Sequence, residues 1–326
     1  MKLRKAALGL VVSTLLAVAG AGFAQTDLSI ATGGTGGTYY PLGGGLAELI
    51  SQHIEGYSAV AEVTGASVEN SGLVSRGDSD MALALADTVV QAYRGTGDFE
   101  NRQLSNLRAL GSMYPNAVQI VTLADSNITS LSDLAGMRVS VGAPGSGTEV
   151  SAQTILNANG ITYDDIDEQR LNFNETANAL RDGQIDAGFW SVGPPTSSIL
   201  DLATTRDVRI LSLSDEEIAN AQAESDVFAI YTMPAGTYPG QDEPVTTIGT
   251  PNVLIVAAEM DEQLAYDIVQ MMFAYVGELR EIHPAANSTT IEFSLGATPI
   301  PLHPGALRYY QEIGADIPDR LMMSAE

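Results

Sequence analysis

The stretch 31-ATGGTGGTYYPLGGGLAELI-50 decides the fold class, because it joins a short apolar run to a helical pattern through a loop with few side chains. It holds seven glycines and three threonines in twenty residues. Such a turn exposes backbone N–H groups at the positive end of a helix dipole, which suits an anion. Thr38 is predicted to be the N-cap, with Pro41 in the first turn. The stretch therefore predicts a strand, an anion-binding loop and a helix.

On both sides of this loop, short apolar runs alternate with helical patterns. Strands are expected at 28–31, 59–63, 81–85, 117–123, 137–141 and 187–190. Helices are expected at 39–53, 68–76, 148–159 and 261–280, and a further helix is expected to end at 181. This alternation is typical of the α/β class, with parallel strands joined by crossover helices. The chain has 326 residues, which exceeds what one core usually organises, so two α/β units in series are expected.

The first 24 residues have the pattern of a secretory signal peptide. Three basic residues precede an apolar run over 6–19, and the small residue Ala24 offers a cleavage point before Gln25. No cysteine follows the run, which argues against a lipid anchor. The pattern predicts an exported, periplasmic protein.

The mature chain is strongly acidic. Beyond residue 24 it carries twelve basic residues, all arginines, against 40 acidic ones, which gives a formal charge of −28. A field of this sign repels polyanions, so nucleic acid and anionic membrane surfaces are excluded as expected partners. A solvated acidic surface explains the charge without naming a ligand.

Two cofactor-binding motifs are excluded because the residues do not match their patterns. The dinucleotide fingerprint needs glycine at its sixth position, and the run that starts at Gly34 has Tyr39 there. The nucleotide-triphosphate loop needs a lysine, and none lies beyond residue 24. No cofactor is expected.

A second glycine-rich loop, 138-RVSVGAPGSGTEVSAQTIL-156, repeats the pattern in the second unit. Ser146, Gly147 and Thr148 would present amides and hydroxyls at a helix N-terminus, a second anion seat. The loop also resembles a nucleophile elbow around Ser146, but Pro144 replaces the first glycine of that motif. A secreted serine hydrolase therefore stays as the alternative, disfavoured because a serine without a partnered base is a poor nucleophile.

Metal ligands are sparse. The sequence has no cysteine and no pair of histidines at helical spacing, and the acidic run 164–168 lacks the glycine and spacing of a calcium loop. No metal site is expected, and the acidic run is interpreted as a solvated face.

With two anion-binding loops in two units, the mature chain resembles the TAXI family, the solute-binding subunits of tripartite ATP-independent periplasmic (TRAP) transporters. The most specific segments are 32-TGGTGGTYYPLG-43, 130-SLSDLAGMRVSVGAPGSGTE-149, 183-GQIDAGFWSVGPPTSSI-199 and 234-PAGTYPGQ-241. The resemblance implies a two-lobed clamshell of the type II periplasmic-binding-protein kind, with crossing strands as the hinge. The segments 110–118 and 226–234 stand where the first and the second unit should end, so lobe I is expected over 25–113 plus 227–326 and lobe II over 114–226.

The same resemblance implies a receptor, not an enzyme, which captures glutamate, glutamine or a dicarboxylate such as 2-oxoglutarate and delivers it to TRAP permease subunits. The alternative outside enzymology is a surface receptor or adhesin. A monomer is expected by default. The residues expected to face the small anionic or zwitterionic ligand are Thr35, Gly36, Thr38, Tyr39, Asp87, Tyr114, Ser146, Gly147, Thr148, Trp190, Gly193 and Pro194.

Two of these residues, Asp87 and Trp190, have a second interpretation. Asp87 could accept a hydrogen bond from a ligand ammonium or could cap the helix that follows it. Trp190 could form a pocket wall or end a strand inside the core. Tyr114 could lend the pocket an aromatic wall and a hydroxyl.

Overall fold

The structure is a computed structural model that describes residues 25–322. The predicted signal peptide, residues 1–24, lies outside the described residues. Within the described range, no helix combines the length and the apolar character needed to cross a membrane.

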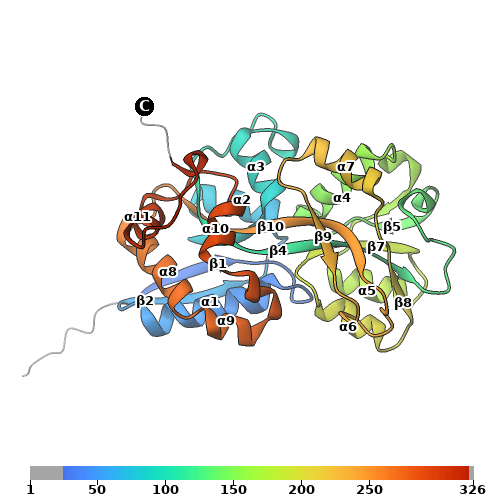
Figure 1. The fold of residues 1–326 in the computed structure, drawn as a ribbon, viewed down its shortest axis with the longest axis horizontal. Coiled ribbons are helices and arrows are strands. Elements are labelled where there is room, and N and C mark those ends of the chain that lie inside the picture. The colour runs from blue at the N-terminus through green and yellow to red at the C-terminus, as the bar shows by residue number, and fades with distance from the viewer. Residues whose placement is uncertain (1–24, 323–326) are drawn as a thin grey trace, which may run out of the picture.

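Ten strands and eleven α-helices alternate along the described residues (Figure 1). The strands are β1 (Thr26–Ala31), β2 (Tyr57–Glu62), β3 (Met81–Leu85), β4 (Leu107–Leu123), β5 (Arg138–Ser140), β6 (Asp167–Gln169), β7 (Ala187–Val192), β8 (Val208–Ile210), β9 (Ala229–Met233) and β10 (Val245–Ala257). The helices are α1 (Tyr39–His53), α2 (Ser67–Arg76), α3 (Ala86–Arg94), α4 (Gly147–Ala158), α5 (Phe173–Arg181), α6 (Ser197–Ala203), α7 (Asp215–Glu224), α8 (Glu262–Ala274), α9 (Val276–Ile282), α10 (Ile291–Ala297) and α11 (Pro304–Glu312).

The strands form one mixed sheet in the order β2-β1-β3-β10-β4-β7-β5-β6, with β8 on β4 and β9 on β10. Both ends of this order are parallel: β1 pairs with β2 and β3, and β5 pairs with β6 and β7. The middle is antiparallel, through β10 on β3 and β4, and through β4 on β7. Each parallel end is one α/β unit, as the alternation predicts.

Two long strands join the units. β4 has 17 residues and β10 has 13, and they pair with each other over most of their length (Figure 1). The register places Pro115 opposite Pro251, so these two residues share one position on neighbouring strands. The segment 110–118, where the sequence predicts the end of the first unit, is therefore the middle of a continuous strand.

Three groups of buried apolar side chains follow this division. One group takes its members from residues 28–114 and 253–321, and the other two take theirs from residues 118–248. Met233 and Val245, which flank the loop between β9 and β10, belong to the second set. We therefore propose that the chain returns to lobe I within β10, and not at residue 227.

The late helical pattern at 261–280 forms two helices. α8 ends at Ala274 and α9 begins at Val276, because Tyr275 leaves the helical conformation with φ −113° and ψ 20°. The Tyr275 ring stacks on His53 at the end of α1, with ring centroids 3.7 Å apart. The break lets both helices follow the surface of lobe I.

Candidate ligand-binding site

The glycine-rich loop ends where α1 begins. Thr38 is the N-cap residue of α1, as predicted, but its side chain makes no capping hydrogen bond. The loop also approaches lobe II closely: a Cβ added at Gly37 would lie 3.0 Å from Cε2 of Phe173. A glycine here therefore allows the two lobes to meet.

The second predicted loop ends in the same way at α4. Ser146 is the N-cap residue, and its Oγ accepts a hydrogen bond from the N–H of Glu149 at 3.2 Å. The N–H groups of Gly147 and Thr148 have no acceptor within residues 25–322. The start of α4 thus keeps two free donors beside the positive end of its dipole.

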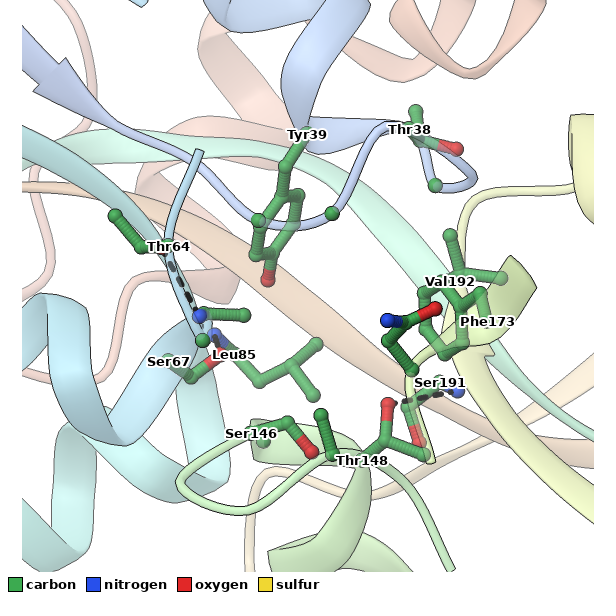
Figure 2. Close-up of a pocket in the computed structure, with 18 of the residues that line it drawn as sticks. Thr38, Tyr39, Thr64, Ser67, Leu85, Ser146, Thr148, Phe173, Ser191 and Val192 are labelled. Atoms are coloured by element: carbon green, nitrogen blue, oxygen red, sulfur yellow. Dashed lines mark hydrogen bonds between the residues drawn. The ribbon is translucent and has the colours of Figure 1, made fainter. Parts of the chain in front are cut away.

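A cavity of about 260 Å³ lies between the lobes, and both loops border it. Figure 2 shows Tyr39 on one side of it, with Ser146 and Thr148 across from it. Its walls include the first residues of α1, α2, α4 and α5, so four helix N-termini meet there. The lining residues are Gly33, Gly34, Gly37, Thr38, Tyr39, Val63, Thr64, Gly65, Ala66, Ser67, Leu85, Ala143, Ser146, Gly147, Thr148, Asn172, Phe173, Ser191 and Val192.

The cavity wall carries no charged side chain among these residues. Its polar groups are hydroxyls, one amide side chain and backbone amides, and its apolar groups include Val63, Leu85, Phe173 and Val192. Helix N-termini and neutral donors can hold an anion without a guanidinium. The anion-binding site that both loops predict stays a prediction.

The lobes contact each other around the cavity through hydrogen bonds to backbone carbonyls. The Thr38 hydroxyl donates to the carbonyl of Gly193 at 2.8 Å, and both groups are buried. The Ser198 hydroxyl donates to the carbonyl of Gly36 at 3.0 Å. On the other side of the cavity, the carbonyl of Gly145 accepts from the first turn of α2. The structure thus shows the two lobes closed on each other.

Replacing Thr38 with valine should lower ligand affinity about fivefold. Valine has nearly the same shape but removes one of the two hydroxyls that donate to the buried Gly193 carbonyl, the other being that of Thr196 at 3.1 Å. Losing one such hydrogen bond costs about 1 kcal/mol in the closed arrangement. Isothermal titration calorimetry on the wild type and the variant measures this change. Thr35→Val is the matched control. Thr35 is exposed, and its hydroxyl accepts a hydrogen bond from the side-chain amide of Asn174 at 3.3 Å. Equal losses in both variants would contradict the role of the Thr38 bond.

Five of the twelve predicted site residues line the cavity: Thr38, Tyr39, Ser146, Gly147 and Thr148. Thr35 is exposed beside it, and Gly36 and Gly193 contribute carbonyls to the contact between the lobes. Pro194 follows Gly193 and forms a cis peptide bond with Pro195. Direct ligand contact stays a prediction for all twelve.

Tyr114 and Trp190 are fully buried behind the cavity wall. Tyr114 lies against Gly193, where an added Cβ would be 3.0 Å from its ring. Trp190 donates its indole N–H to the Ser198 hydroxyl at 3.1 Å and stacks behind Phe173, with centroids 6.1 Å apart. Both residues support wall residues and do not line the cavity themselves.

Asp87 is the second residue of α3, whose N-cap position is Leu85. Its carboxylate accepts from the N–H of Thr88 at 2.8 Å and from the Ser151 hydroxyl at 2.6 Å. Burial raises the pKa of this carboxyl to about 6 from its ordinary value of 3.8. Asp87 therefore lies at a contact between lobes, since Ser151 is on α4, and it is absent from the cavity wall.

The walls from α2 and α5 were not predicted from the sequence as parts of the site. Gly65, Ala66 and Ser67 follow β2, and Asn172 caps α5 by accepting from the N–H of Glu175. A capping signal was present at Asn172, since glutamate follows three residues later. Nothing in the local sequence shows that these helix starts lie beside the other two.

A family model described as the NMT1-like family matches residues 30–314. The chain belongs to the NMT1-like family. The matched range begins in β1, ends just after α11, and contains every residue that lines the cavity.

Solved structures show the fold of this NMT1-like chain. A putative L-cystine ABC transporter from Listeria monocytogenes matches with a TM-score of 0.51 at 14% identity, over 82% of this chain and 98% of that one. XAC2383 from Xanthomonas citri, bound to ATP, matches with a TM-score of 0.50 at 15% identity, over 89% of this chain and 96% of that one. The predicted α/β fold of the type II periplasmic-binding-protein kind is confirmed.

Proposed function

We propose that this NMT1-like chain is an extracytoplasmic solute-binding receptor that closes its two lobes on a small organic anion. The observation that carries the proposal is the cavity between the lobes, to which both contribute polar groups and helix N-termini. A ligand that touches both lobes favours the closed arrangement through its higher affinity for that arrangement. The hydrogen bonds of Thr38 and Ser198 across the cleft also stabilise the closed arrangement.

An anion bound to the residues beyond 24, which carry a formal charge of −28, needs local donors to replace its water shell. The N–H groups of Gly147 and Thr148 and the nearby hydroxyls supply such donors. Their dipoles are fixed by α4, so they need little reorganisation when the ligand binds.

The finer assignment is a TAXI-type receptor of a TRAP transporter in the periplasm. It is supported by the resemblance of the four quoted segments and by the signal-peptide pattern at residues 1–24. Glutamate, glutamine and 2-oxoglutarate-like dicarboxylates are the first ligands to test, and TRAP permease subunits are the expected partners. Co-purification with a permease would separate this role from that of an adhesin.

The test is a thermal-shift panel of small organic anions on the mature chain, followed by small-angle X-ray scattering with and without the best ligand. A bound ligand at 100 times its Kd should stabilise the protein by about 2.7 kcal/mol. Scattering should show a smaller radius of gyration in the bound state. Stabilisation without compaction would reject closure, and no stabilisation by any anion would reject the receptor.

The hydrolase alternative depends on Ser146. Its hydroxyl caps α4, and within residues 25–322 no histidine forms a hydrogen bond with it. His283 instead contacts the carbonyl of Pro195 at 3.0 Å, and His303 caps α11. Ser146→Ala is expected to bind the ligand within tenfold of the wild type, with no turnover in either protein. Ligand hydrolysis that disappears in the variant would instead establish the enzyme.

A further inference from the structure

Two of the hydroxyls that line the cavity, those of Thr148 and Ser146, are free to donate hydrogen bonds. The Thr148 hydroxyl accepts from the N–H of Ser191 at 3.3 Å, and the Ser146 hydroxyl accepts from the N–H of Glu149. Within the described residues, neither hydroxyl proton has an acceptor of its own. A hydroxyl that accepts from the backbone keeps its proton to donate. Both protons are therefore free for a ligand.

The buried hydroxyl of Ser191 has no hydrogen-bond partner in the described part of the chain. Ser191 lines the cavity and is only 5% exposed. Buried hydroxyls are normally hydrogen-bonded, so this group points to a ligand. It lies next to Thr148, at the start of α4, where two backbone N–H groups are also free (Figure 2).

Carboxylates, in contrast, are absent from the cavity wall among the described residues. Glu69, Asp87 and Glu149 lie on the helices that begin near the cavity, and each already has a partner. Glu69 accepts from the N–H of Gly65, Asp87 from Ser151 and Thr88, and Glu149 pairs with Arg170 at 2.9 Å. An ammonium in the cavity would have no carboxylate to contact.

We infer that this site selects organic anions that lack an ammonium group, and that it discriminates against the corresponding amino acids. The inference rests on the proposed function and narrows its ligand class. The free donors around Gly147, Thr148 and Ser191 bind the carboxylate, while the apolar side chains of Leu85, Phe173 and Val192 contact the carbon skeleton. An α-ammonium would lose its water shell without a carboxylate to balance its charge, which is costly.

The test uses ligand pairs that differ only at the α-carbon. Calorimetry compares 2-oxoglutarate with glutamate, and pyruvate with alanine, on the mature wild-type chain. In every pair that binds, the oxo acid should bind at least tenfold more tightly than the amino acid. A pair in which the amino acid binds equally or better would overturn the inference but leave the receptor intact. Failure of every anion in the panel would overturn the proposed function, and this inference with it.

A pair of variants tests the physical cause. Val63 lines the cavity mouth and is 58% exposed, so a polar replacement there should not disturb folding. Val63→Asp supplies the missing carboxylate and should reduce the preference for the oxo acid by at least fivefold. Val63→Asn, which is similar in size but neutral, should retain the wild-type preference. An unchanged preference in Val63→Asp, with both variants folded, would show that a missing acceptor is not the cause.

Discussion

Replacing Gly147 with alanine should weaken ligand binding by about 10- to 100-fold, because the new methyl group blocks closure of the lobes. A Cβ at this position would lie 2.6 Å from Oγ of Ser67 and 2.7 Å from Cδ1 of Leu85. Ser67 begins α2 and Leu85 ends β3, both in lobe I, whereas Gly147 is the first residue of α4 in lobe II. Overpacking of this kind costs roughly 1–3 kcal/mol, and here it falls on the closed state alone.

The unliganded stability of this variant should be preserved, since alanine favours a helix more than glycine does. The measurements are calorimetry with the best anion of the panel and scattering with that anion at saturation. The variant should keep the larger radius of gyration of the open form. Gly44→Ala is the matched control, because Gly44 lies in α1 with no atom within 4 Å of its added Cβ. Wild-type affinity in Gly147→Ala would disprove closure through this contact.

Elements with strong local signals could be predicted from the sequence at residue accuracy. α1 runs from Tyr39 to His53, and β3 from Met81 to Leu85, as predicted. In α1, the N-cap position Thr38 and the apolar spacing both act within a few residues of each other. Such signals need no partner elsewhere in the chain.

The crossing strands could not be delimited in this way. Gly111 and Pro115 resemble a boundary in the sequence, and Pro251 interrupts the pattern of β10. Their strand conformation is set by pairing between residues more than 130 positions apart, such as Asn116 with Thr250. The TAXI resemblance implied crossing strands, but their limits depend on this long-range register.

In the candidate site, too, some parts have strong local signals and others depend on tertiary packing. The loops before α1 and α4 could be recognised because glycines and cap residues gather within a few positions. The walls from α2 and α5 carry ordinary cap signals, and only the packing of the lobes brings Ser67 and Phe173 to the cavity. Local sequence therefore indicates the kind of groups that a loop offers to a ligand. Tertiary contacts decide which of these loops lie at the same cavity.

The contact of Asp87 with Ser151 has an expected pH dependence. Asp87 belongs to α3 and Ser151 to α4, so the buried carboxyl lies at a contact between the lobes. The charge of Asp87 also raises the pKa of Tyr39, although burial is the larger cause of that shift. Burial raises the pKa of Asp87 to about 6, hence the closed state binds a proton more tightly than a state with the ordinary pKa of 3.8.

The raised pKa of Asp87 sets the direction in which ligand affinity changes with pH. A raised carboxyl pKa means that protonation favours the closed state, so the gain appears as the pH falls through about 6 and is lost as the pH rises above it. With an ordinary pKa in the open state, ligand affinity should increase about fourfold between pH 7.5 and pH 5.5, and about tenfold at pH 5.0.

Asp87→Asn should remove this dependence, because asparagine is uncharged at every pH and its amide oxygen can still accept from Ser151. Affinity in the variant should be nearly constant over this range and, at pH 7.5, at least equal to that of the wild type. Calorimetry across the pH range, with a ligand that does not itself titrate there, provides the comparison. Asp201→Asn, at an exposed position on α6, is the control and should keep the wild-type profile. An identical pH profile in wild type and Asp87→Asn would show that closure does not take up a proton at this carboxyl.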